Sequence, residues 1–154
     1  MKNIFLIFML CALSACSTMT EVKLYSGENL PDDKIAKLYI DPHVVLSRVN
    51  DITKHPGGSN RALAHSAGMR REYISLKPGI YEIEAAFFML CLKSKRPRTL
   101  RLEAHAGESY RLVSEIIDDT YWKPYIQRYQ GEEVPDNGPF FKSLCPVDIT
   151  IIFI

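Results

Sequence analysis

The side chains best suited to acid–base or metal chemistry are four histidines, His43, His55, His65 and His105. Imidazole is the commonest protein metal ligand, but a local metal motif needs two histidines two to four positions apart, and no two of these have that spacing. His55 and His65 lie in a glycine- and proline-containing stretch, residues 50–70, which favours a long loop. We assign no metal ligand and no cofactor. The 50–70 loop is kept as an alternative site for a small ligand or a metal ion.

Hydroxyl and carboxyl groups give no stronger sign of catalysis. Ser66 stands in His-Ser-Ala-Gly, which is not the Gly-x-Ser-x-Gly turn that exposes a nucleophile. The acidic pairs at 32–33, 118–119 and 132–133 are adjacent residues in predicted turns. Adjacent side chains point apart in an extended chain, so none of these pairs forms a local catalytic dyad. We therefore predict that the protein is not an enzyme.

The first sixteen residues have the layout of a secretory signal. Lys2 supplies one positive charge, an apolar run from Ile4 to Leu13 follows, and Ser14 and Ala15 are small. A membrane-spanning helix needs roughly 20 apolar residues, so this run is too short to cross a bilayer. The pattern predicts a cleaved signal peptide over residues 1–15.

The sequence Leu13-Ser14-Ala15-Cys16 resembles the lipobox of bacterial lipoproteins. In that family the cysteine thiol receives diacylglycerol, the chain is cut before the cysteine, and the new amine is acylated, commonly with palmitate. The resemblance implies that lipid on Cys16 anchors the protein in a membrane. Ser17, where an aspartate favours inner-membrane retention, implies the periplasmic face of the outer membrane, with the inner membrane as the alternative.

Two further cysteines, Cys91 and Cys145, lie in the mature chain. Neither has a Cys-x-x-Cys spacing or a neighbouring histidine, so a catalytic thiol is not indicated. The periplasm is oxidising, and a bridge between them would close a loop of 54 positions, 145 minus 91, contributing roughly 4 kcal/mol. Two buried free thiols are the alternative.

A dense basic cluster follows Cys91. It consists of Lys93, Lys95, Arg96 and Arg98. These cations could contact anionic lipid headgroups, lipopolysaccharide phosphate or an acidic partner. The alternative is a hairpin tip whose charge protects a sheet edge.

The elements that must position these residues follow a period of two, which is typical of strands. We predict strands near 22–24 and at 34–40, 43–49, 71–76, 81–92, 100–104, 110–112 and 147–154. Residues 86–92 are apolar on both faces and are expected to be buried on both sides. The segments 100–104 and 110–112 are predicted to form a β-hairpin. Residues 118–138 are predicted to be irregular, with Trp122 filling the core rather than stacking on a sugar.

Two stretches resemble a family of small envelope modules. Leu-Lys-Pro-Gly-Ile-Tyr-Glu-Ile at 76–83 and Ala-Gly-Glu-Ser-Tyr-Arg-Leu at 106–112 are similar to PEGA-type and related Ig-like or transthyretin-like domains. The resemblance implies a module without catalytic residues. The expected fold is mainly β, an antiparallel β-sandwich after a cleaved signal peptide.

Length and charge limit the remaining function classes. The 154 residues suit one domain, which we place at 21–154 after a lipidated tether at 16–20. Lys and Arg total 19 and Asp and Glu total 18, so the chain lacks the cationic excess of a nucleic-acid binder. The sequence predicts a non-enzymatic binding or scaffolding lipoprotein with a protein partner in the cell envelope.

Overall fold

The computed structural model describes residues 19–56, 62–65, 71–89, 92–117, 121–131 and 150–151. Within these ranges the chain forms β-strands and one 3-10 turn, η1 (Asp32–Lys34), with no α-helix. No helix among the described residues is long and apolar enough to cross a membrane. The predicted mainly β fold is confirmed.

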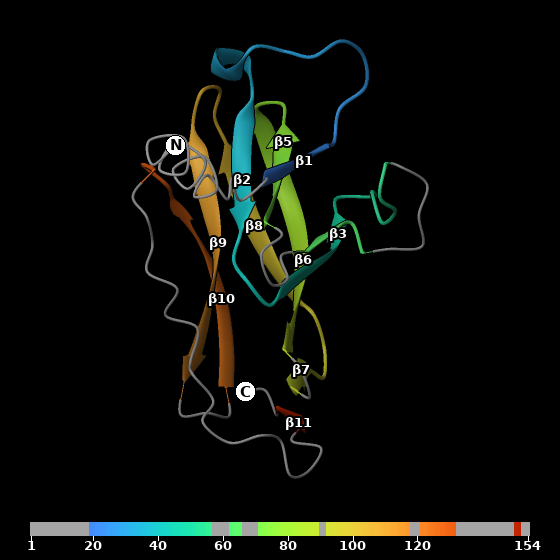
Figure 1. Ribbon diagram of the computed structural model, residues 1–154, viewed down its shortest axis with the longest axis vertical. Coiled ribbons are helices and arrows are strands. Elements are labelled where there is room, and N and C mark those ends of the chain that lie inside the picture. The colour runs from blue at the N-terminus through green and yellow to red at the C-terminus, as the bar shows by residue number, and fades with distance from the viewer. Residues whose placement is uncertain are drawn as a thin grey trace, which may run out of the picture.

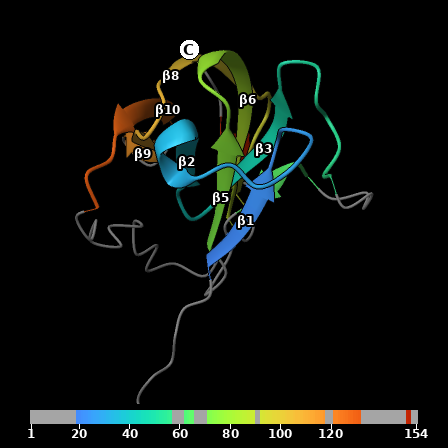
Figure 2. The same cartoon turned by 90° about the horizontal axis from the view of Figure 1, so that it is seen from above.

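The strands form two sheets that lie against each other as two layers (Figures 1 and 2). The strands of the first sheet, in spatial order, are β1 (Met19–Lys23), β5 (Arg71–Leu76), β2 (Ala36–Ile40), β9 (Ser109–Ile117) and β10 (Tyr121–Arg128). Those of the second are β11 (Thr150–Ile151), β7 (Leu92–Ser94), β6 (Gly79–Met89), β3 (Val44–Val49) and β4 (Ala64–His65), with β8 (Arg98–Ala104) also paired to β6. The predicted strands at 34–40, 43–49 and 71–76 are confirmed to within two residues at their ends.

The sheets are mixed, so the expectation of a wholly antiparallel sandwich is wrong. β1 pairs with β5, β2 with β9 and β11 with β7, all in parallel. Parallel neighbours need a long crossover between them. The connection from β2 to β9 contains most of the second sheet, which is why no local pattern could reveal this pairing.

The core lies between the layers and follows the predicted alternation. Leu38, Ile74 and Leu112 of the first sheet and Leu46 and Ile83 of the second are all fully buried. Burial of each such side chain contributes about 1.5–3 kcal/mol. The rings of Trp122 and Phe87, one from each sheet, pack with centroids 6.0 Å apart. Trp122 is thus a core residue, as predicted.

The second half of β6 differs from the prediction of burial on both faces. Ile83, Ala85 and Phe87 point into the core, whereas Phe88 is 55% exposed. Phe88 continues the outward series of Glu82 and Glu84, because side chains alternate along a strand. This part of β6 is therefore amphipathic, with one buried face and one exposed face, although its sequence is apolar at every position.

The predicted hairpin of 100–104 with 110–112 is also wrong. β8 pairs with β6, while β9 pairs with β2 and β10, so the turn between β8 and β9 carries the chain from one sheet to the other. Gly107 has φ +75°, a left-handed conformation, and its N–H donates to the Ile35 carbonyl oxygen over 2.8 Å. The sequence predicts the turn correctly, but it does not specify which sheet the next strand joins.

The segment 118–138 was predicted to be irregular, yet its described part forms β10, paired with β9 over eight residues. Pro124 lies inside this strand, opposite Ser114. β10 is the edge strand of its sheet, where a proline can be accommodated because one side of the strand needs no partner. Proline was thus a marker of an edge here and not of a loop.

Candidate functional site

The predicted basic cluster lies beyond a hairpin tip: Lys93 belongs to β7, Lys95 and Arg96 lie between β7 and β8, and Arg98 begins β8. The chain reverses between Met89 and Leu92, which pair with each other. Phe88 pairs with Lys93, and Ala85 pairs with Arg98. The interval between these two pairs is three residues along β6 but five residues along the returning chain. The two extra residues form a bulge between β7 and β8. The interpretation as a charged hairpin tip is corrected accordingly.

The structure exposes three of the four predicted cations and partly buries the fourth. Lys93, Lys95 and Arg96 are exposed. Arg98 is half-buried, stands opposite core-facing Ala85, and is engaged in an interaction of its own. We call Lys93, Lys95 and Arg96 the basic segment. Phe88 lies directly beside it, and sequence reasoning missed this residue.

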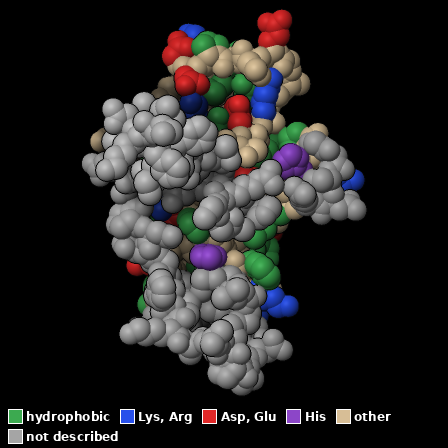
Figure 3. All heavy atoms as spheres, in the orientation of Figure 1, with side chains coloured by type: hydrophobic (Ala, Val, Ile, Leu, Met, Phe, Trp, Pro, Cys, Tyr) green, Lys and Arg blue, Asp and Glu red, His purple; other side chains and the backbone are tan. Residues whose placement is uncertain are grey.

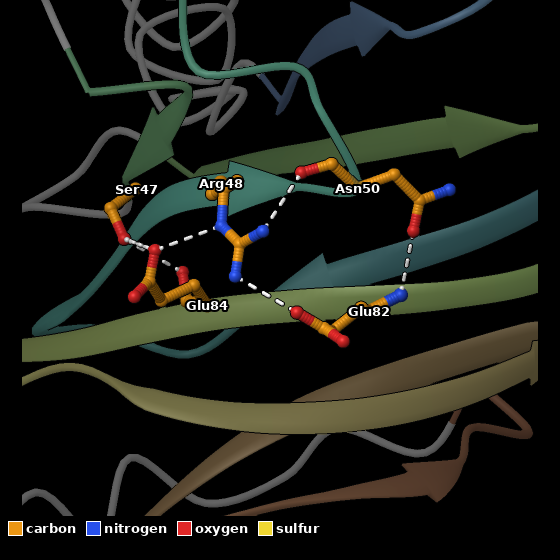
Figure 4. A network of polar contacts seen from close by, with 5 residues as sticks. All are labelled: Ser47, Arg48, Asn50, Glu82 and Glu84. Atoms are coloured by element: carbon orange, nitrogen blue, oxygen red, sulfur yellow. Dashed lines mark hydrogen bonds and ion pairs between the residues drawn. The ribbon is translucent and has the colours of Figure 1, made fainter.

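A polar network joins β3 to β6 on the outer face of the second sheet (Figure 4). Arg48 donates from Nε to Glu84 Oε2 over 3.1 Å and from Nη2 to Glu82 Oε1 over 2.9 Å. These hydrogen bonds, the one to Glu84 first, hold the pKa of the Arg48 guanidinium above its ordinary value. Asn50 Oδ1 accepts the Glu82 N–H over 2.8 Å, and the Ser47 hydroxyl donates to the Glu84 carbonyl oxygen over 3.1 Å.

Both carboxylates of this network are ion-paired with one guanidinium, that of Arg48. The arrangement is suited to fixing the register of two strands.

A second network closes the end of the first sheet. Asp41, 8% exposed, follows β2, and its carboxylate accepts hydrogen bonds from Arg111 Nε and from the Ser114 N–H, the latter over 3.3 Å. The Ser114 hydroxyl in turn accepts the Trp122 indole N–H over 2.9 Å. This chain of bonds ties the turn after β2 to β9 and β10.

The Tyr110 hydroxyl is the centre of a third polar group. It accepts the His105 backbone N–H over 3.1 Å and lies 3.0 Å from both the Glu103 carbonyl oxygen and Glu108 Oε2. Burial is the main cause that raises the pKa of Tyr110 above its ordinary value. Arg128 Nε pairs with Glu108 over 3.1 Å.

A cavity of about 400 Å³ adjoins the Tyr110 group, lined by Tyr39, Gly107, Glu108, Ser109, Arg128, Tyr129, Gln130 and Gly131. The Tyr39 and Tyr129 rings meet there with centroids 4.9 Å apart. Its two charged groups, Glu108 and Arg128, pair with each other. Its lining comes from three distant stretches of sequence, so no local motif could predict it.

The histidines do not form a cluster among the residues described. His105 is exposed and lies 3.6 Å from Glu103, and the His43 ring lies 6.2 Å from that of Phe87. His55 is half-buried after β3, and His65 belongs to β4. In the described part of the chain, no group of three or more His, Cys, Asp or Glu residues could hold a metal ion. Residues 57–61 and 66–70 lie outside that part, so the 50–70 site stays a prediction.

The other predicted site residues also lie outside the described ranges. These are Cys16, Cys91 and Cys145, together with the signal segment 1–15. The chain segments that follow the last two cysteines are neighbours, since Thr150 of β11 pairs with Lys93 of β7. The disulfide between Cys91 and Cys145 stays a prediction.

Comparison of the chain with protein-family models, curated proteins and solved structures gave no match.

Proposed function

We propose that this chain is a lipoprotein anchored through Cys16 at the periplasmic face of the outer membrane, where it acts as a non-enzymatic binding or scaffolding module. The observation that carries the proposal is the position of the lipobox-like sequence 13–16 directly before a β-rich domain. The first strand, β1, begins at Met19, three residues after Cys16.

The short connection limits how far the domain can move from its anchor. Three residues span at most roughly 11 Å even when fully extended. β1 is an integral strand, paired with β5 over five residues, and its Val22 is 2% exposed. A chain with two or more acyl groups would be held stably in the bilayer. The domain would therefore work within reach of the membrane surface, and its partners belong there.

The ion pairs of the described residues serve the fold. Asp41 is tied to Arg111, Glu82 and Glu84 to Arg48, and Glu108 to Arg128. Each charge is used to join strands. Two packed sheets also agree with the finer proposal of an Ig-like or transthyretin-like architecture, although the parallel pairs depart from a wholly antiparallel module.

Metabolic labelling with a fatty-acid analogue tests the anchor. In a Gram-negative host, the parent chain and a Cys91→Ser control should incorporate label and fractionate with the outer membrane. The Cys16→Ser variant should remain unlabelled. An unlabelled parent chain, or label that persists in Cys16→Ser, would refute the proposal.

Site-specific crosslinking in intact cells tests the scaffolding role. A photoreactive residue placed in turn at exposed positions of the two sheets, such as Thr99 of β8 and Lys123 of β10, should give a discrete protein adduct from one sheet and not from the other. If several exposed positions across both sheets gave no protein adduct, the scaffolding role would be wrong even with the anchor intact.

A further inference from the structure

We propose that Phe88 of β6 and the basic segment form a second membrane contact. Phe88 would enter the interface of a phospholipid bilayer, and the basic segment would bind its anionic headgroups. The contact needs no lipid on Cys16 and so goes beyond the proposed anchor.

The apolar part of the contact is an aromatic side chain that the fold leaves outside. Phe88 is 55% exposed and points away from the core, and its ladder partner Lys93 stands on the same face. In the space-filling view, hydrophobic and Lys or Arg side chains adjoin each other at the end of the molecule where β7 lies (Figures 1 and 3).

The charged part of the contact has no compensating carboxylate nearby in the chain. Between Glu84 and Glu103 the sequence has five Lys or Arg residues and no Asp or Glu. In the described ranges, no carboxylate pairs with Lys93, Lys95 or Arg96, whereas Arg48 on the same sheet is paired twice. Each cation near an anionic leaflet strengthens the attraction about fivefold.

Each end of β6 has an exposed apolar side chain, but the two differ in the charge of their neighbours. Ile80, at the other end of the strand, is 58% exposed, but its ladder partner is Glu103. Of these two ends, the Phe88 end joins an exposed apolar side chain to cations that have no carboxylate partner among the described residues. Protection of a sheet edge requires charge but no exposed ring. An apolar residue flanked by cations is the combination that binds the interface of an anionic membrane.

Tryptophan fluorescence in reconstituted vesicles tests the contact. The full-length chain, purified from membranes, would be placed in vesicles with brominated acyl chains, made of phosphatidylcholine alone or mixed with phosphatidylglycerol. F88W should be quenched in the anionic vesicles only, and I80W in neither. The single native tryptophan, Trp122, is 3% exposed and supplies the baseline.

The second part of the experiment removes the charges of the basic segment. Adding K93Q, K95Q and R96Q to F88W should lower the ratio of docked to undocked domain on the order of 100-fold and abolish quenching. The matched changes K34Q, K54Q and K123Q, also at exposed positions, should leave quenching unchanged. Thermal melts followed at Trp122 verify that each variant is folded.

Three results would overturn the contact: equal quenching in both vesicle types, equal quenching of F88W and I80W, or quenching that survives loss of the basic segment. Sedimentation with neutral vesicles reports the lipid anchor separately. A chain that sediments with neutral vesicles without quenching of F88W on anionic ones keeps the anchor and refutes the contact. A chain that does not sediment with neutral vesicles, but whose F88W variant is quenched on anionic vesicles, refutes the anchor and keeps the contact.

Discussion

Removal of the Asp41 carboxylate should strongly destabilise the fold. Only 11% of the Asp41 side chain and 14% of the Arg111 side chain are exposed, so the pair is largely withdrawn from water. Truncating one member of a buried pair leaves the other charge uncompensated, which costs about 3–5 kcal/mol. Asp41→Ala also removes the acceptor for the Ser114 N–H. The free energy of unfolding of a protein domain is about 5–15 kcal/mol in total, so the loss is a large fraction of the stability.

A double-mutant cycle in urea separates the pair from its surroundings. Unfolding can be followed by the fluorescence of Trp122, whose indole N–H bonds to Ser114. Asp41→Ala and Arg111→Met should each lower the free energy of unfolding, and the double variant should lose about 2 kcal/mol less than the sum of the two, because it buries no lone charge. A loss below about 1 kcal/mol for Asp41→Ala, or strict additivity, would refute the reasoning.

Three further outcomes are expected. His43 has φ +71°, so His43→Gly should be more stable than His43→Ala by about 1 kcal/mol in urea unfolding, and equal stabilities would contradict the strained turn. The raised pKa of Tyr110 means that the folded state holds this proton more tightly than the unfolded chain. The contribution of this proton to the free energy of unfolding should be complete below about pH 10, and it should be lost as pH rises through the pKa of Tyr110 in the folded state. Tyr110→Phe should therefore reduce the loss of stability measured between about pH 8 and 11. Alkylation of the denatured mature protein should find no free thiol at Cys91 or Cys145 before reduction, whereas free thiols there would exclude the bridge.

The sequence pattern predicted individual strands well where one face is buried. Ile83 and Leu102 alternate with Glu82 and Arg101, and the same period appears in the burial of β6 and β8. A period of two carries this information locally because each strand residue faces either the core or the outside.

Pairing between strands could not be predicted in the same way. The turn at Gly107 was taken as a hairpin, but β9 joins β2 in the other sheet, with Leu38 opposite Tyr110. That choice depends on contacts more than 70 residues apart, which no turn signal encodes. Pro124 likewise suggested irregular structure, because its tolerance depends on β10 being an edge.

The candidate site was predicted in part. The charges of the basic segment were evident from the sequence, and three of the four predicted cations are exposed. Their aromatic neighbour was missed because an unbroken apolar run was interpreted as buried on both faces. Extending the alternation from Glu82 and Glu84 to Phe88 would have placed that ring outside.

The most direct test of the lipid anchor is the intact mass of the protein isolated from its native membrane. The account predicts a chain that begins at Cys16 and carries diacylglycerol on the thiol, with or without a further acyl group on the amine. A mass that retains residues 1–15, or that corresponds to an unmodified cysteine, would contradict it.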